Sequence, residues 1–162
     1  MAITQTRLQQ ASIGNTYPRV KAYGQRVAFL CHSHHDGALA IGLQALLRQQ
    51  GLDLYIDWQD AEMPERPSAE TASRLRTRIK EANLFLYLAT QNSARSRWCP
   101  WELGYADGVK NIAQILVIPT LDGTTEHGAE YINLYQRIDL NAAGALEVIQ
   151  PGRSFGVSVR SF

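Results

Sequence analysis

A short segment, SRWCPWELGYADG (Ser96 to Gly108), gathers two tryptophans, a cysteine, a proline and an acid within a few residues. Proline is tolerated in the first turn of a helix, so we expect a helix that begins near Pro100 and has Glu102 in its first turn. A glutamate there can complement the helix dipole, which stabilises a fold by about 0.3–1 kcal/mol. The same dipole would keep a carboxylate ionised in a cleft, where it could bind sugar hydroxyls or face a developing cation. This segment alone leaves both roles open.

A second polar cluster, CHSHHD (Cys31 to Asp36), contains a thiol, three imidazoles and a carboxylate. Zinc needs side chains that converge from about four directions, whereas alternate residues that leave a strand point to opposite faces. His127 is the only other histidine, so no second cluster completes a metal shell. We therefore expect a polar turn with Asp36 near the start of the next helix, and no metal. The two cysteines, Cys31 and Cys99, are expected to be free thiols.

Several well-known catalytic motifs are absent from the sequence. It contains no G-x-x-x-x-G-K-[ST] loop, no G-x-G-x-x-G after the first predicted strand and no G-x-S-x-G. This absence argues against a P-loop enzyme, a classical dinucleotide dehydrogenase and a serine hydrolase. Asp57 ends a predicted strand, as in a phosphorelay receiver. However, the first predicted strand ends in CHS and offers no acidic pair to hold magnesium.

The elements that must position these residues alternate between strand and helix. Apolar runs predict five strands, over Arg26–Ser33, Leu52–Asp57, Asn83–Thr90, Gln114–Thr120 and Tyr135–Leu140. Helical spacing of apolar residues predicts helices over Ala38–Gly51 and Thr71–Glu81, before the one that begins near Pro100. This order predicts an α/β fold, a parallel sheet with helices on both faces. Ligands bind beyond the carboxyl ends of such strands, which here means the loops 31–37, 57–70, 90–100 and 120–130.

The composition is that of an ordinary globular protein. The 162 residues fit one domain, 45% are hydrophobic, and 16 Lys and Arg against 15 Asp and Glu give a net charge of +1. We expect no nucleic-acid or membrane partner, since there is no basic excess, no membrane-spanning run and no signal peptide. The expected location is the cytoplasm. We expect a polar N-terminal arm over 1–25, the domain over 26–150 and a loosely held C-terminal tail over 151–162.

Three ordered segments resemble the Toll/interleukin-1 receptor (TIR) domain, specifically the bacterial stand-alone kind. VAFLCHSHHD (Val27 to Asp36) is similar to the first box of that family, and LYIDWQD with the following MPERP is similar to its second strand and loop. LATQNSARSRWCPWELGYADG (Leu88 to Gly108) resembles the third strand, the serine-rich loop and the W-x-x-x-E helix, with Trp98 and Glu102 in the motif. The resemblance spans about 26–140 and implies the flavodoxin-like TIR fold, with a five-stranded, mainly parallel sheet.

One segment departs from the family pattern. Many signalling members have a Pro-Gly pair in the second loop, where this chain has Met63, Pro64, Glu65 and Arg66. The contacts that receptor-type loops make are therefore not transferred to this chain.

The resemblance implies an enzyme that cleaves the nicotinamide–ribose bond of NAD⁺. Glu102 would be the catalytic carboxylate, stabilising an oxocarbenium-like transition state, and Trp98 would pack against the base or shape the pocket. NAD⁺ would be the substrate, and neither a cofactor nor a metal is required. Six further residues are candidates for substrate binding. Ser33 and His34 follow the first strand, and Trp58 and Asp60 lie in the second loop. Arg95 and Arg97 could pair with the diphosphate.

The resemblance also implies possible products and partners. Where water is excluded, an adenine nitrogen or a ribose hydroxyl attacks the sugar and gives a cyclic ADP-ribose isomer instead of ADP-ribose. Small TIR proteins of this kind resemble those of anti-phage systems such as Thoeris, which make a messenger for a separate effector. We also expect self-association through TIR–TIR contacts. Two alternatives stay open: a non-catalytic TIR adaptor, and a nucleoside deoxyribosyltransferase, which also uses a cleft glutamate on an N-glycosidic bond.

Overall fold

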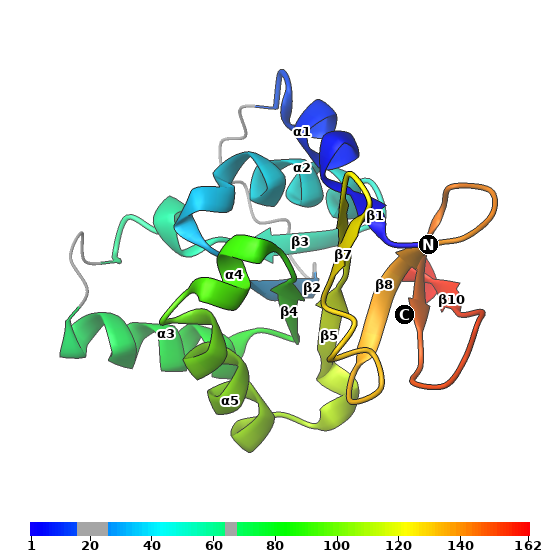
Figure 1. Ribbon diagram of the computed structural model, residues 1–162. Helices are drawn as coiled ribbons and strands as arrows, with labels where there is room; N and C mark the ends of the chain where they lie inside the picture. Colours follow the sequence, from blue (N-terminus) through cyan, green and yellow to red (C-terminus); the bar gives the residue numbers. More distant parts are fainter. Residues whose placement is uncertain (16–25, 64–67) are drawn as a thin grey trace.

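The computed structural model describes residues 1–15, 26–63 and 68–162. The predicted loop residues Pro64, Glu65 and Arg66 lie outside these ranges, as does the second part of the predicted N-terminal arm. The main sheet has seven strands in the order β10-β9-β8-β5-β4-β2-β3 (Figure 1). Its strands are β2 (Arg26–Cys31), β3 (Leu52–Tyr55), β4 (Leu84–Leu88), β5 (Ile115–Ile118), β8 (Gln136–Leu140), β9 (Leu146–Ile149) and β10 (Val157–Ser158).

The five predicted strands are confirmed as β2, β3, β4, β5 and β8, each a little shorter than expected. They pair in parallel throughout, with Ala28 opposite both Leu54 and Leu84, for example. The structure adds β9 and β10, which extend the sheet by antiparallel pairing beyond β8. The prediction of a mainly parallel α/β sheet is therefore correct, although the sheet has more strands than predicted.

Helices cover both faces of this sheet (Figure 1). Helices α1 (Gln5–Ser12) and α2 (Gly37–Arg48) lie on one face, and α3 (Ala69–Glu81) and α5 (Cys99–Val109) lie on the other. Alternate residues of the central strands supply two separate apolar cores, because successive side chains of a strand point to opposite faces. Leu30 and Leu86 belong to the core under α2, and Phe29 and Phe85 to the core under α3 and α5.

The described part of the predicted N-terminal arm is packed onto the domain. Strand β1 (Ile3–Thr4) pairs in parallel with β6 (Thr120–Asp122), and β6 forms a hairpin with β7 (Thr125–His127). Ile3 and Leu8 are fully buried in the core on the α2 side. Gly42 of α2 permits the close approach of α1, since a Cβ there would lie 1.8 Å from the Leu8 carbonyl oxygen. Residues 1–15 are therefore part of the fold.

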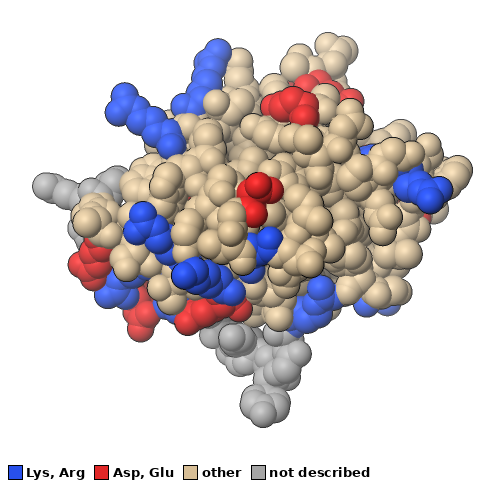
Figure 2. All heavy atoms as spheres, turned by 90° about the horizontal axis from the view of Figure 1, so that it is seen from below, with Lys and Arg blue, Asp and Glu red and all other residues tan. Residues whose placement is uncertain are grey.

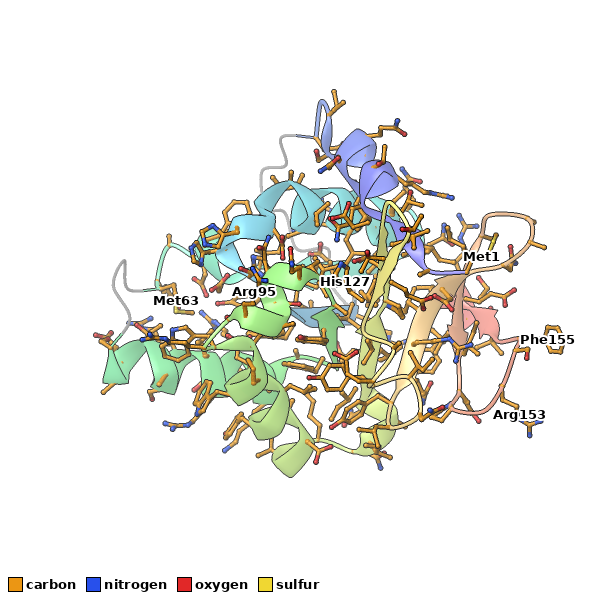
Figure 3. All side chains as sticks on the ribbon, viewed as in Figure 1. Met1, Met63, Arg95, His127, Arg153 and Phe155 are labelled. Carbon is orange, nitrogen blue, oxygen red and sulfur yellow. The ribbon has the colours of Figure 1, made fainter. Side chains whose placement is uncertain are left out.

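The predicted C-terminal tail is anchored rather than loosely held. Strand β10 pairs with β9, and Val159 is buried in the core on the α2 side. Arg153 and Phe155, between these strands, extend away from the body of the protein (Figure 3). The tail therefore has fixed contacts at its end and an exposed loop before them.

The face that carries α3 and α5 mixes both signs of charge. Figure 2 shows Lys and Arg side chains scattered among Asp and Glu side chains and uncharged residues on this face. None of the helices in the described ranges has the length and apolar character that a membrane crossing requires.

Candidate active site

Helix α5 begins one residue before the predicted Pro100 and carries Glu102 in its first turn. The Ser96 hydroxyl caps this helix by accepting hydrogen bonds from the backbone N–H groups of Trp98, at 3.1 Å, and Cys99, at 3.2 Å. The Glu102 N–H donates to the Trp98 carbonyl at 2.8 Å, so helical geometry reaches back to Trp98. The sequence-based prediction of this helix start is confirmed.

Glu102 is buried, with 6% of its surface exposed. Burial is the main cause that raises the pKa of its carboxyl well above the ordinary value, since a charged form is poorly solvated there. A hydrogen bond with Cys31 lowers this pKa, and the nearby Cys99 and Asp57 raise it further. The sequence predicts that the helix dipole lowers this pKa and keeps the group charged. The net shift in the free protein has the opposite direction, with desolvation as its main cause.

Two buried thiols adjoin Glu102. Cys31 ends β2 and Cys99 begins α5; both are free, and the Cys31 thiol donates to the Cys99 carbonyl oxygen at 3.6 Å. Burial raises the pKa of Cys31 well above its ordinary value. The pKa of Cys99 is lowered, chiefly by a hydrogen bond with Cys31. Cys31 is therefore a protonated donor at the candidate site, a role that the sequence did not reveal.

The carboxyl ends of β2 and β4 are joined by a buried carboxylate. Asp36 is 4% exposed and accepts hydrogen bonds from Thr90 Oγ1 and Asn92 Nδ2, both at 2.6 Å. Asp36 lies at the start of α2, as predicted, but its side chain makes no capping hydrogen bond to that helix. It instead fixes the loop that leads to α4 (Gln91–Arg95) and then to Glu102.

A histidine and a tryptophan meet at the ends of β2 and β3. The Trp58 indole Nε1 donates to His32 Nε2 at 3.0 Å, and His32 Nδ1 lies 3.2 Å from the Leu30 carbonyl oxygen. Trp58 is 49% exposed, whereas the His32 side chain is only 2% exposed. Trp58 was among the predicted site residues and His32 was not. The sequence signal for His32 was its place directly after the first strand.

The two candidates after β2 occupy different environments. Ser33 is buried, and its hydroxyl accepts the His35 backbone N–H at 3.4 Å at the start of the short 3₁₀ helix over His34–Asp36. His34 is exposed, and its ring lies 3.8 Å from that of His35, measured between centroids. Both residues lie at the carboxyl edge of the sheet, close in sequence to Cys31.

Asp60 is held by helix α3. Its carboxylate accepts hydrogen bonds from the Tyr55 hydroxyl at 2.7 Å and from Arg78 Nε at 3.0 Å. The same residues line a pocket of about 390 Å³ between β3 and α3, and Glu102 is not among its lining residues. The structure therefore does not join the Asp60 carboxylate directly to Glu102.

The remaining candidates surround the start of α5. Arg95 lies at the end of α4 (Figure 3), and both Arg95 and Arg97 are exposed. Within the described ranges, neither guanidinium forms an ion pair, so both are available to an anion. Trp98 is half-buried, and its ring packs edge to face against Trp101 at a centroid distance of 5.4 Å.

The donor set of the site does not resemble a metal centre. Among the residues that the structure describes, no group of three or more His, Cys, Asp or Glu side chains is arranged to hold a metal ion. The site offers one buried carboxyl, Glu102, beside the Cys31 and Cys99 thiols.

Comparison with known proteins places the chain in a family. A family model described as "TIR domain" matches residues 28–148. The chain is 35% identical over 112 residues to "Probable 3' cyclic ADP-D-ribose synthase ThsB'" of Bacillus cereus (strain MSX-D12). The match covers 66% of this chain and 57% of that relative, so the chain spans less than two thirds of the relative's length.

Proposed function

Since the chain belongs to the TIR domain family, we propose that it cleaves the nicotinamide–ribose bond of NAD⁺ and closes the remaining ADP-ribose into a ring. The observation that carries this proposal is the buried carboxyl of Glu102 at the carboxyl edge of the parallel sheet, four residues after Trp98. The name of the relative, a probable cyclic ADP-ribose synthase, supports ring closure over hydrolysis.

Glu102 acts on the ribose next to nicotinamide. The glycosidic C–N bond breaks, its electron pair stays with the nicotinamide nitrogen, and nicotinamide leaves as a neutral molecule. Positive charge then develops on the sugar, and the Glu102 carboxylate stabilises it and holds the ribose hydroxyls. The positive charge of the bound nicotinamide also favours the ionised form of a carboxyl whose pKa burial raises.

Ring closure needs a nucleophile from the same molecule. A hydroxyl of the adenosine ribose attacks the sugar carbon, forms the new C–O bond and gives up its proton to Glu102 or to solvent. The name of the relative favours a product closed at a 3′ position. A carboxyl that is only 6% exposed meets little bulk water, which favours this internal attack over hydrolysis.

The other candidates bind the rest of the dinucleotide. Trp98 and Trp58 contact the bases, Ser33 and His34 line the edge near β2, and Arg95 and Arg97 pair with the diphosphate. Asp60 contributes indirectly, through the loop that it anchors to Arg78.

The proposed setting is antiviral defence. The product would be a diffusible messenger for a separate effector protein in the cytoplasm, as implied by the likeness to Thoeris proteins. TIR–TIR self-association would complete or stabilise the site, so the specific activity should rise with protein concentration.

The decisive experiment is incubation of the purified protein with NAD⁺ at high protein concentration and with a crowding agent, followed by separation of the products by mass. We expect nicotinamide and a product equal to ADP-ribose minus one water, and loss of both in Glu102→Gln. Glu126→Gln is the matched control, because Glu126 is an exposed glutamate on β7.

Two outcomes would change the proposal. Turnover by Glu102→Gln equal to that of the parent would remove Glu102 from the mechanism. No turnover under any assembled condition would favour the alternative of a non-catalytic TIR adaptor, in which assembly is measured instead by light scattering.

A further inference from the structure

We propose that His32 is a positioning residue that holds the Trp58 indole at the mouth of the site, where its ring stacks on a planar base of the dinucleotide. This inference rests on the proposed function and adds a residue that the W-x-x-x-E motif does not contain. Two hydrogen bonds support it: one joins the Trp58 indole to His32, and the other joins His32 to the backbone of β2.

The contacts fix the protonation pattern of the His32 ring. The indole Nε1 is only a donor, so His32 Nε2, 3.0 Å away, must accept and carries no proton. The Leu30 carbonyl is only an acceptor, so His32 Nδ1, 3.2 Å away, carries the hydrogen. These two contacts are those of the Nδ1–H tautomer, with both ring nitrogens engaged, and an Asp57 carboxylate oxygen also lies 4.0 Å from Nε2. The His32 side chain is 2% exposed, which leaves it little freedom to turn.

The pair is placed beside Glu102 by the residues that precede it. Cys31, directly before His32, donates to the Cys99 carbonyl oxygen at the start of α5, three residues before Glu102, and Asp57, directly before Trp58, acts electrostatically on the Glu102 carboxyl. His32 and Trp58 thus lie next to the two residues from β2 and the end of β3 that influence the reacting group. Trp98 lies directly before α5, the helix that carries Glu102 in its first turn.

The exposure of Trp58 fits a ligand-binding ring. Trp58 is 49% exposed although its Nε1 is fixed, and within the described ranges its ring makes no aromatic or cation–π contact. An indole held by its edge offers a ring face without the entropy cost of ordering it on binding. NAD⁺ contains two planar bases, nicotinamide and adenine, and both stack on an indole face.

The first test measures steady-state kinetics of NAD⁺ cleavage. Trp58→Ala should raise KM roughly 5- to 150-fold, the range expected for loss of one stacked base, with a smaller change in kcat. His32→Leu, which keeps the volume but loses the acceptor, should also raise KM. His32→Gln, whose side-chain oxygen can accept the indole N–H, should restore most of the affinity. His35→Ala is the control, because His35 is exposed and, in the described structure, makes no contact with Trp58.

A double-mutant cycle separates positioning from general stability. In Trp58→Phe the ring remains but its donor is lost, so adding His32→Leu should change KM little further. A purely structural His32 would instead show the same increase in KM in both backgrounds, which would overturn the inference.

Nicotinamide mononucleotide, which lacks adenine, identifies the base that stacks on Trp58. An effect of Trp58→Ala on the KM for this substrate assigns the nicotinamide, and an effect on the KM for NAD⁺ alone assigns the adenine.

A spectroscopic test needs no turnover. In ¹⁵N-labelled protein without NAD⁺, His32 should show the Nδ1–H tautomer, and His32→Leu should shift the indole N–H resonance that Trp58→Phe removes. An unshifted resonance would refute the contact itself. If the contact is present but KM is unchanged in Trp58→Ala, the inference fails while the proposed function stands. If NAD⁺ is neither cleaved by the parent nor bound by Glu102→Gln, the proposed function fails, and the stacking role of Trp58 fails with it.

Discussion

At the scale of single residues, burial is the main influence on the pKa of Glu102. The carboxyl lies in the first turn of α5, but desolvation raises its pKa well above the ordinary value. The hydrogen bond with Cys31 opposes this rise, whereas Cys99 and Asp57 add to it. Glu102 is thus a group whose ionisation costs stability in the free protein and is favoured when a cation binds.

This imbalance predicts that Glu102→Gln stabilises the protein at neutral pH. The folded-state pKa lies above the unfolded one, so the folded state binds more protons between the two values and its stability falls as pH rises through that window. A neutral glutamine does not titrate. We therefore expect the melting temperature at pH 7 to rise; at this chain length each 1 kcal/mol gained corresponds to about 2–4 °C.

The gain should vanish below the unfolded pKa of glutamate, about 4.3, because both proteins are then uncharged at this position. Melting curves from about pH 4 to pH 8 measure it, with the exposed Glu126→Gln as a control that should show no such change. A gain independent of pH would contradict this account.

Cys31 supplies a second prediction, for the pH dependence of the proposed reaction. The proposed mechanism requires the Glu102 carboxylate, so kcat/KM should rise with pH through the Glu102 pKa. Cys31→Ala removes the hydrogen bond that lowers this pKa, so the acidic limb should move to higher pH. Cys31→Ser keeps a donor at this position and should leave the limb closer to that of the parent. Identical limbs in the alanine and serine variants would show that the thiol has no effect on Glu102.

At the scale of elements, the loop after β3 is tied to α3 by one buried carboxylate. Burial by itself would raise the pKa of Asp60, but hydrogen bonds from Tyr55, the Glu62 backbone and Arg78 outweigh it, so the pKa is lowered. Such a group contributes stability above the unfolded pKa, and that stability is lost as pH falls through the folded pKa. The link therefore holds the site loop in place at neutral pH and weakens in acid.

We accordingly expect Asp60→Asn to lower the free energy of unfolding by about 1–3 kcal/mol at pH 7, the usual effect of disrupting a buried charged hydrogen bond. The difference from the parent should begin to shrink below about pH 4, where the unfolded parent chain takes up a proton at this carboxyl, and should close as pH falls through the lower folded-state pKa. Urea unfolding at several pH values measures this. Glu70→Gln removes an exposed ion pair with Arg74 and should cost less than about 1 kcal/mol. Equal losses in the two variants would argue against a special role for Asp60.

At the scale of the whole molecule, the N-terminal segment completes the core above α2. Ile3 and Leu8 are fully buried, and the missing side chain of Gly42 lets the α1 backbone approach α2 closely. Helix α1 has only one buried residue, so its fold depends on this docking rather than on its own propensity. The domain is thus larger than the range expected from the sequence.

Leu8→Ala tests this view. Removal of a fully buried leucine side chain should lower stability by about 2–5 kcal/mol, because a cavity remains. Ile13→Ala, in the same segment but at a side chain that is 79% exposed, should change stability by less than about 0.5 kcal/mol. Chemical unfolding of the two variants gives the comparison, and a Leu8→Ala variant as stable as the parent would show that α1 is dispensable.

The sequence by itself determined the parallel sheet and the place of Glu102 in the first turn of a helix. Apolar runs located the five parallel strands, and Pro100 located the helix start before Glu102. Both signals are local, because they depend only on residue types that are close together in the sequence. The antiparallel strands β9 and β10 were missed because they are short: β9 has four residues, and β10 has two, both exposed. The packing of residues 1–15 was missed because their apolar residues are few.

Only the tertiary structure decided the surroundings of Glu102. Trp58 contacts His32 across 26 residues, Thr90 contacts Asp36 across 54, and Cys31 contacts Cys99 across 68. No local pattern encodes such pairs, because they depend on which strands become neighbours in the sheet. Burial likewise depends on the whole fold. The segment Ser96 to Gly108 therefore predicted that Glu102 lies at a helix start, but it could not reveal that desolvation raises the pKa of this carboxyl.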